Sequence, residues 1–334
     1  MTTTNKQVLL AARPKGAPVE SDFRLVETEL RDPEEGEVLV KNRFLSLDPY
    51  MRSRMSEAKS YAESVAIGDV MIGGTVGEVV RSRHAKLGVG DFVVGQLGWQ
   101  QYAVSSGVGM MKVDPGKVPL SAYLGAVGMP GVTAWYGLHD IGKPKAGETV
   151  VVGAASGAVG AVVGQLAKIA GCRAIGIAGG KDKCAYVTGE LGFDACLDHH
   201  DPALKERFRE ATPGGVDIYF ENVGGAILDM VLGRLNAFAR IPLCGLVSQY
   251  NATEPYGVKN FGSLLMNRVH LQGFIISEHM DRWPPALAGL GTHVVEGRIK
   301  YRESIAKGLE SAPSAFIGML EGKNFGKQLV DLVP

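Results

Sequence analysis

Short apolar runs separated by glycine, proline and aspartate turns dominate the chain up to about residue 120. Runs such as Glu37–Lys41 and Asp91–Gly95 have the short, alternating character of half-buried β-strands. Gly73–Val80 has the pattern of a turn that leads into a buried strand. This part of the chain is therefore predicted to form an antiparallel, barrel-like β domain.

The pattern changes near residue 149, where continuous apolar runs begin to alternate with longer helical segments. Strands are predicted at Thr149–Val152, Arg173–Ile177, Val216–Phe220, Ala239–Leu243 and Val269–Ile275, and helices at Ala158–Ala170 and Lys181–Leu191. This alternation is typical of a doubly wound parallel sheet, so the fold class is α/β. From about residue 299, Ile299–Arg302 and Lys327–Val330 return to short strands that are expected to join the first domain.

Composition and charge disfavour two classes of function, nucleic-acid binding and membrane association. The 35 Lys and Arg residues balance 35 Asp and Glu residues, and no basic block stands out, so a nucleic-acid partner is not expected. No apolar run approaches the roughly 20 residues that span a bilayer, and no signal peptide is evident, so we expect no membrane association. The four cysteines form no Cys-x-x-Cys pair, which favours a reducing compartment, the cytoplasm.

A glycine-rich segment, Val150–Gly164, is the sharpest local signal. It follows a predicted buried strand and opens a predicted helix, where a dinucleotide-binding turn belongs. Gly157, Ala158, Val159 and Gly160 would present backbone amides and the positive end of the helix dipole to a pyrophosphate. Ala155 replaces the first glycine of the usual motif. The alternative, a helix that packs on a strand through small residues, is disfavoured by the strand–helix–strand context.

The end of the second predicted strand bears on the choice of nucleotide. NAD-binding folds usually have an acidic residue there, whereas this chain continues into Ala178–Lys183. A cation at this point suits a 2′-phosphate, so NADP(H) is the expected cofactor, with Lys183 as the ligand and Lys181 as the second candidate. In the alternative interpretation both lysines are solvated in the first turn of a helix.

Six segments recur in this order in one known group of enzymes: Leu47–Arg52, Gly128–Trp135, Ala154–Gly160, Glu221–Gly225, Cys244–Asn251 and Gly322–Lys327. Over essentially its whole length the chain resembles the zinc-independent medium-chain dehydrogenase/reductases, in the group of leukotriene/prostaglandin reductases, alkenal double-bond reductases and bacterial curcumin reductases. The resemblance implies a GroES-like substrate and catalytic domain over 1–123, completed by 299–334, and a Rossmann NADP-binding domain over 124–298.

The resemblance also implies which residues contact the cofactor. Besides the four residues of the glycine-rich turn, these are Gly179, Lys183, His199, Asn222, Cys244, Gly245, Ser248, Tyr250, Phe274 and Asn324. Related proteins often have a tyrosine where this chain has His199. A histidine can also donate to the adenosine phosphate, more strongly when protonated, although a solvated loop histidine is the alternative.

No metal is expected. Zinc-dependent relatives of this superfamily bind the ion through cysteine and histidine on segments where this chain has Leu45, Gly74 and Thr75. These residues supply no set of three protein ligands for a catalytic zinc. Alcohol oxidation that depends on a Lewis acid is therefore not favoured.

The resemblance implies reduction of the carbon–carbon double bond of an α,β-unsaturated ketone or aldehyde, by hydride transfer from NADPH to the β-carbon. Tyr250 is then the donor to the substrate carbonyl, and Tyr50 lines the other side of the pocket; each has an alternative as an ordinary loop or turn aromatic. Two other functions stay open: NADPH quinone oxidoreductase and an NADP-binding protein without turnover. A homodimer is expected, with Val269–Ile276 as a strand that pairs across a two-fold axis, unless that run is simply buried.

Overall fold

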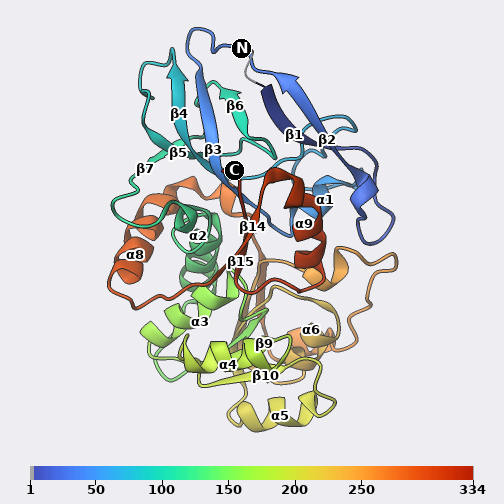
Figure 1. The fold of residues 1–334 in the computed structure, drawn as a ribbon. Coiled ribbons are helices and arrows are strands. Elements are labelled where there is room, and N and C mark those ends of the chain that lie inside the picture. The colour runs from blue at the N-terminus through green and yellow to red at the C-terminus, as the bar shows by residue number, and fades with distance from the viewer. Residues whose placement is uncertain (1–3, 334) are drawn as a thin grey trace. The chain divides into compact units, whose positions relative to one another are not determined.

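The computed structural model describes residues 4–333 and separates into two compact units. One unit consists of Met1–Leu124 together with Glu303–Pro334, and the other of Gly125–Arg302. We call them the discontinuous unit and the central unit. Each is described here by itself (Figure 1).

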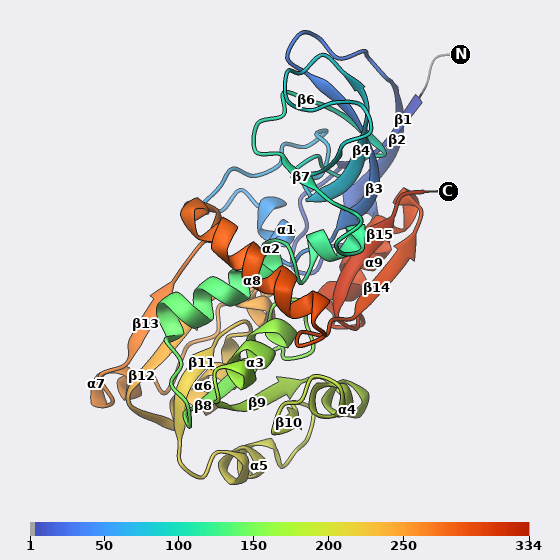
Figure 2. The same ribbon diagram turned by 90° about the vertical axis from the view of Figure 1, so that its left-hand side faces the viewer.

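The central unit contains a six-stranded parallel sheet (Figure 2). Its strands are β8 (Thr149–Gly153), β9 (Arg173–Ala178), β10 (Ala195–Asp198), β11 (Val216–Phe220), β12 (Leu235–Leu243) and β13 (His270–Gly273). The order across the sheet is β10-β9-β8-β11-β12-β13. The chain thus starts in the middle, winds out to one edge, and returns to wind out to the other, which is the dinucleotide-binding Rossmann arrangement. The predicted α/β fold class is confirmed.

Helices cover both faces of this sheet, because its strands are apolar on both sides. Helices α5 (Leu204–Ala211) and α6 (Gly225–Leu232) pack on one face, where Phe208 and Val231 join Val151, Tyr219 and Ile241 in one buried cluster. On the other face α3 (Gly160–Ile169) contacts β8 and β9. Helix α2 (Met129–Tyr136) packs on both α3 and α8 (Trp283–Val295) (Figure 2). Helices α4 (Lys181–Gly189) and α7 (Gly262–Met266) complete the α-helices described in this unit.

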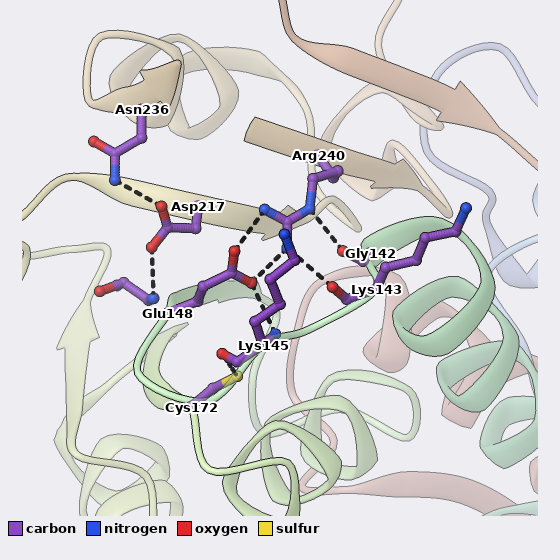
Figure 3. Close-up of polar contacts among 9 residues, drawn as sticks. Gly142, Lys143, Lys145, Glu148, Cys172, Asp217, Asn236 and Arg240 are labelled. Carbon is purple, nitrogen blue, oxygen red and sulfur yellow. Dashed lines mark hydrogen bonds and ion pairs between the residues drawn. The ribbon is translucent and has the colours of Figure 1, made fainter. Parts of the chain in front are cut away.

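A network of polar contacts connects β8, β11 and β12 away from their carboxyl ends (Figure 3). Both guanidinium amino groups of Arg240 on β12 contact the carboxylate of Glu148, which precedes β8, and its Nε donates to the carbonyl of Gly142 at 2.8 Å. Asp217 on β11 accepts the Thr149 amide at 2.8 Å and the Asn236 amide group at 2.8 Å. Such bidentate, half-buried contacts fix the register of β8, β11 and β12.

The discontinuous unit has a seven-stranded sheet and a separate two-stranded ribbon. The ribbon pairs β1 (Thr4–Leu10) with β2 (Phe23–Glu29). The sheet has the order β14-β15-β3-β4-β5-β7, and β6 pairs with β3. Its strands are β3 (Val38–Ser46), β4 (Thr75–Ser82), β5 (Phe92–Gly95), β6 (Tyr102–Ser105), β7 (Met111–Val113), β14 (Glu303–Lys307) and β15 (Lys327–Asp331). All pairings are antiparallel except that of β14 with β15.

Two short helices and an aromatic cluster complete this unit. Helix α1 (Met51–Arg54) follows β3, and α9 (Ala312–Leu320) lies between β14 and β15 in the chain. The ring of Phe23 stacks on that of Trp99 at 5.5 Å, and Phe316 of α9 meets both rings edge-on. Segments from both parts of the unit therefore share one core.

The predicted strand at Ile299–Arg302 is wrong. The amide of Lys300 donates to the Gln165 side chain on α3 at 2.8 Å, and its carbonyl accepts from the same side chain at 2.8 Å. These backbone groups are therefore not available to a sheet, and the strand β14 begins only at Glu303. The predicted helices at Ala158–Ala170 and Lys181–Leu191 are present over the shorter ranges of α3 and α4. Between residues 4 and 333 no helix has the length and apolar character needed to cross a membrane.

Candidate cofactor and substrate site

All of the predicted cofactor residues of the central unit except Lys183 follow the carboxyl end of a strand. The turn with Gly157 and Gly160 follows β8, Gly179 follows β9, and His199 follows β10. Asn222 follows β11, the segment from Cys244 to Tyr250 follows β12, and Phe274 follows β13. Because the strands are parallel, these ends meet at one edge of the sheet, where ligands of open α/β sheets bind. Lys183 lies in the first turn of α4 beside this edge.

The turn after β8 has the tight geometry that a pyrophosphate requires. Ala154 has a positive φ of 52°, and the Gly157 amide donates to its carbonyl at 2.9 Å. A Cβ on Gly160 would lie 2.4 Å from that carbonyl oxygen, so glycine is required there. No side chain caps α3, which begins at Gly160. The positive end of the helix dipole therefore lies at this turn, and the residues present fit a dinucleotide phosphate.

Two basic side chains lie beside the ends of β9 and β10. A Cβ on Gly179 would lie 2.9 Å from Nε2 of His199, so the imidazole passes close to this glycine. Burial, followed by the neighbouring His200, lowers the pKa of His199. Burial also lowers the pKa of Lys183. The carboxylate of Asp198 accepts the amides of Gly180 and His200 at 2.9 and 3.0 Å, which fixes the backbone around this basic pair.

The segments after β11 and β12 are hydrogen-bonded to each other. The carboxamide of Asn222 donates to the Gly153 carbonyl at the end of β8 at 2.8 Å. Its backbone carbonyl accepts the Val247 amide at 3.1 Å, and the Val223 carbonyl accepts the Ser248 hydroxyl at 2.6 Å. Predicted contacts on three neighbouring strands are therefore connected through backbone and side-chain bonds.

The side chains of Tyr250 and Cys244 differ in what they can do chemically. The Tyr250 hydroxyl accepts the Leu246 amide at 3.4 Å, so the phenol lies over the segment that follows β12. Burial raises the pKa of the Cys244 thiol to about 12, with a smaller contribution from Glu221. The Cys244 thiol is therefore protonated at neutral pH and does not act as a nucleophile.

Phe274 lies at the predicted strand end, but its ring is only 8% exposed. It packs against Tyr136 at 5.4 Å and Phe220 at 6.4 Å between ring centroids. Phe274 therefore offers little exposed surface to a ligand in this conformation.

In the discontinuous unit, Tyr50 precedes α1 and pairs with the side chain of Gln96. Burial, and then the charge of Asp48, raises the pKa of its hydroxyl well above the ordinary value. Tyr50 is therefore a proton donor at neutral pH and not a base. The guanidinium of Arg54 lies 5.9 Å from its ring centroid.

Sequence reasoning missed a buried ion pair two residues before Tyr50. The Lys327 ammonium donates to Asp48 Oδ1 at 2.9 Å and to the Leu47 carbonyl at 2.6 Å, and Asp48 also accepts the Ser46 hydroxyl. Both charged residues occur in segments that carried the family resemblance, but nothing in a linear pattern indicates that they meet.

Asn324, in the loop before β15, lines a shallow groove in the same unit, with a volume of about 400 Å³. Its carboxamide donates to the Gly326 carbonyl at 2.8 Å. Of the positions that bind zinc in related enzymes, Leu45 is fully buried, and the hydroxyl of Thr75 donates to Asn42 at 2.9 Å. Within residues 4–333 no three His, Cys, Asp or Glu side chains come together in a way that could hold a metal ion.

Two sequence families match parts of the chain: residues 6–113 match the N-terminal domain of oxidoreductase, and residues 158–290 match zinc-binding dehydrogenase. The chain is 52% identical to the NADPH-dependent curcumin reductase of Escherichia coli over 332 residues, 98% of this chain and 96% of that protein. It is 42% identical to a 2-alkenal reductase (NADP(+)-dependent) of Nicotiana tabacum over 98% of this chain and 97% of that protein.

Solved structures of similar fold include proteins with related names. CurA from Vibrio vulnificus in complex with NADPH has a TM-score of 0.94 at 49% identity, with 98% of this chain and 99% of that chain covered. The quinone oxidoreductase of Escherichia coli complexed with NADPH has a TM-score of 0.78 at 20% identity, over 98% and 100% of the two chains. The second likeness concerns the fold alone.

Proposed function

The chain belongs to the medium-chain dehydrogenase/reductase family, in the group of the curcumin and 2-alkenal reductases, and we propose that it reduces the carbon–carbon double bond of α,β-unsaturated ketones and aldehydes with NADPH. The observation that carries this proposal is the 52% identity to a curcumin reductase over nearly the whole chain. The Rossmann sheet and the tight turn after β8 supply the matching site for a dinucleotide.

When bound, NADPH supplies the hydride. The turn Gly157–Gly160 and the positive end of the α3 dipole would hold its pyrophosphate, Lys183 and His199 its 2′-phosphate, and the remaining strand-end residues its sugars and nicotinamide. The remaining strand-end residues are Gly179, Asn222, Cys244, Gly245, Ser248, Tyr250 and Phe274. The family resemblance also assigns Asn324, in the loop before β15, to the cofactor. The lowered pKa of His199 means that Lys183 provides the positive charge near neutral pH.

Negative charge develops on the substrate carbonyl oxygen as the β-carbon accepts hydride. Tyr250 would donate its hydroxyl proton in a hydrogen bond to that oxygen, and a preorganised donor of this kind is worth roughly 10²–10³ in rate. The raised pKa of the Tyr50 hydroxyl keeps this second tyrosine a donor. We propose that this chemistry needs no metal, since Leu45, Gly74 and Thr75 offer no set of zinc ligands.

Quinone reduction is the second candidate activity, because the fold is shared with quinone oxidoreductases. These share only about a fifth of their residues with this chain, whereas the alkene reductases share two fifths or more. An NADP-binding protein without turnover is the third candidate. The presence of Tyr50 and Tyr250 in family-like segments favours an enzyme.

We infer that the protein forms a homodimer through β13. This strand ends the parallel sheet and is mostly exposed, which disfavours the alternative of a buried strand. Large apolar side chains are exposed around it: Phe238, Phe261, Leu265, Met266 and Leu271. A second copy would pair with the open edge and cover this patch. Sedimentation of wild type and of Leu271→Lys tests this, since a wild-type monomer would contradict it.

We infer that the protein works in the cytoplasm. Its four cysteines are free thiols, as in proteins of reducing compartments, and cell fractionation tests the location.

The experiment for the proposed activity measures NADPH oxidation with a 2-alkenal, an aryl enone and a simple quinone, with product analysis for the saturated carbonyl. We expect turnover of the enones and loss of the double bond with the carbonyl retained. Tyr250→Phe should lower kcat by roughly 10²–10³ with little change in NADPH affinity. Oxidation of NADPH by the quinone alone would favour the second candidate, and binding without any oxidation the third.

A further inference from the structure

The side chain of Glu221, at the end of β11, is fully buried at the edge of the sheet that carries the predicted site. We propose that Glu221 is a positioning residue that holds Asn222 and Tyr250 in their working geometry. This inference rests on the proposed function, because those two residues matter only if the site reduces substrate.

The backbone of Glu221 joins β11 to the segment after β12. Its amide donates to the Pro242 carbonyl at 3.0 Å, and its carbonyl accepts the amides of Cys244 and Gly245 at 2.9 and 3.1 Å. The start of the Tyr250 segment is therefore attached directly to this residue.

The carboxyl group of Glu221 fixes the turn that follows. One oxygen, Oε1, accepts the amides of Val223 and Gly224 and the Tyr219 hydroxyl, the last two at 3.0 and 3.1 Å. Gly224 has a φ of 76°, which a residue with a side chain adopts only at a cost. The carboxyl group supplies the acceptor that stabilises this bend.

The shape of the turn passes to Tyr250 through a short series of hydrogen bonds. The Val223 carbonyl accepts both the amide of Ser248, at 3.0 Å, and its hydroxyl, at 2.6 Å. The Tyr250 amide donates to the Val247 carbonyl at 3.4 Å, and its hydroxyl accepts the Leu246 amide at 3.4 Å. A change in the turn would therefore move the phenol.

The other carboxyl oxygen, Oε2, is buried and has no hydrogen-bond partner among the described residues. The titratable groups that interact with the Glu221 carboxyl group are Tyr219 and Cys244, and burial raises the pKa of both. Burial also raises the pKa of Glu221 itself. The geometry fits a neutral acid with its proton on Oε2, because Oε1 accepts three bonds and a lone buried charge would be costly.

Glutamine is the test of a neutral acid, because Glu221→Gln keeps the accepting oxygen and loses only the ionisable proton. Glu221→Met keeps the length and loses the acceptor. We expect Glu221→Gln to stay within about threefold of wild-type kcat and Glu221→Met to lose about 10- to 100-fold, as a displaced catalytic group does.

Asp229 on α6 is a matched control. It is also buried, and its carboxylate accepts the amides of Lys259 and Asn260 and the Tyr256 hydroxyl, so it fixes a turn that carries no predicted site residue. Asp229→Leu should lower stability and leave kcat of the remaining folded enzyme nearly unchanged.

Two readouts separate positioning from a general structural role. If Glu221 acts through Tyr250, the double variant Glu221→Met/Tyr250→Phe has the same kcat as Tyr250→Phe alone. Amide hydrogen exchange of the cofactor-free protein should be faster over residues 244–250 in Glu221→Met. It should change much less there in Asp229→Leu, whose turn contacts this segment through the Tyr256 amide on the Gln249 side chain.

Multiplied losses in the double variant, unchanged exchange over 244–250, or a Glu221→Gln variant as impaired as Glu221→Met would each overturn the proposal. If wild type reduces no enone, the proposed function fails, while the exchange result still decides whether Glu221 holds this segment.

Discussion

Lys327→Met is expected to destabilise the discontinuous unit strongly. The substitution replaces a buried ammonium by an apolar side chain of similar length. The Lys327 and Asp48 side chains are 4% and 8% exposed, and the variant leaves the Asp48 carboxylate with the Ser46 hydroxyl and without its cation. Breaking a buried ion pair on one side costs about 3–5 kcal/mol, because the remaining charge is buried without compensation.

The intact ion pair itself should contribute much less than about 3–5 kcal/mol to the free energy of unfolding. Burial is the largest influence on the Lys327 ammonium and lowers its pKa, and the attraction of Asp48 opposes this without reversing it. Desolvation of the charges therefore offsets most of their attraction. The double variant Lys327→Met/Asp48→Leu should accordingly recover most of the stability lost in the single variant.

Urea unfolding measures these differences. Trp99 is fully buried in the discontinuous unit, so its fluorescence reports this unit once Trp135 and Trp283 are replaced by Phe. Lys112→Met is the control, because Lys112 pairs with Asp91 at 2.6 Å but is 52% exposed, and it should change little. The reasoning is refuted if Lys327→Met unfolds no earlier than Lys112→Met, or if the double variant is less stable than the single one.

Three further predictions concern the central unit. A Cβ on Gly164 would lie 1.7 Å from the buried Phe193 ring, so Gly164→Ala should lower the free energy of unfolding by about 1–3 kcal/mol. Gly189→Ala is the control and should not lower it, because a Cβ there meets no atom within 4 Å. Equal thermal unfolding midpoints of the two variants would contradict this packing. The lowered pKa of His199 means that it gains its charge only below its ordinary pKa of about 6.5, so NADPH affinity relative to NADH should rise with acidity more in wild type than in His199→Gln. Parallel curves would remove His199 from the phosphate site. Lys183→Ala should weaken NADPH much more than NADH in fluorescence titrations, and equal losses would exclude it as the 2′-phosphate ligand.

Most of the parallel sheet was predictable, because β8, β9, β11 and the second half of β12 are mostly apolar runs followed by glycine or a polar turn. The edge strand β10 was not predicted, because its four residues are only partly buried and include Asp198. Most of the predicted cofactor residues follow these strands, and the carboxyl ends of parallel strands share one edge. Helix α3 begins later than predicted because residues 154–159 form a tight turn with a positive φ at Ala154, which small residues in a row do not reveal.

Contacts between distant residues could not be predicted in the same way. Lys327 and Asp48 are 279 positions apart in the sequence. The side chain of Gln165 hydrogen-bonds the backbone of Lys300, which lies 135 positions further along the chain. Hydropathy describes which side of an element is buried and not which polar groups meet there. The role of Glu221 was hidden for the same reason, because its partners depend on the bend at Gly224.

The discontinuous unit also constrains the order in which the chain can mature on the ribosome. Strand β15 pairs with β3, with Leu329 opposite Ser46, yet every residue of the central unit is synthesised between them. The Phe44–Ser46 end of one side of β3 therefore stays unpaired until translation is nearly finished, while β4 and β6 already pair with the rest of β3 and the parallel sheet can assemble. A nascent polypeptide that stalls before residue 303 exposes that side to aggregation, and chaperones would be needed there first.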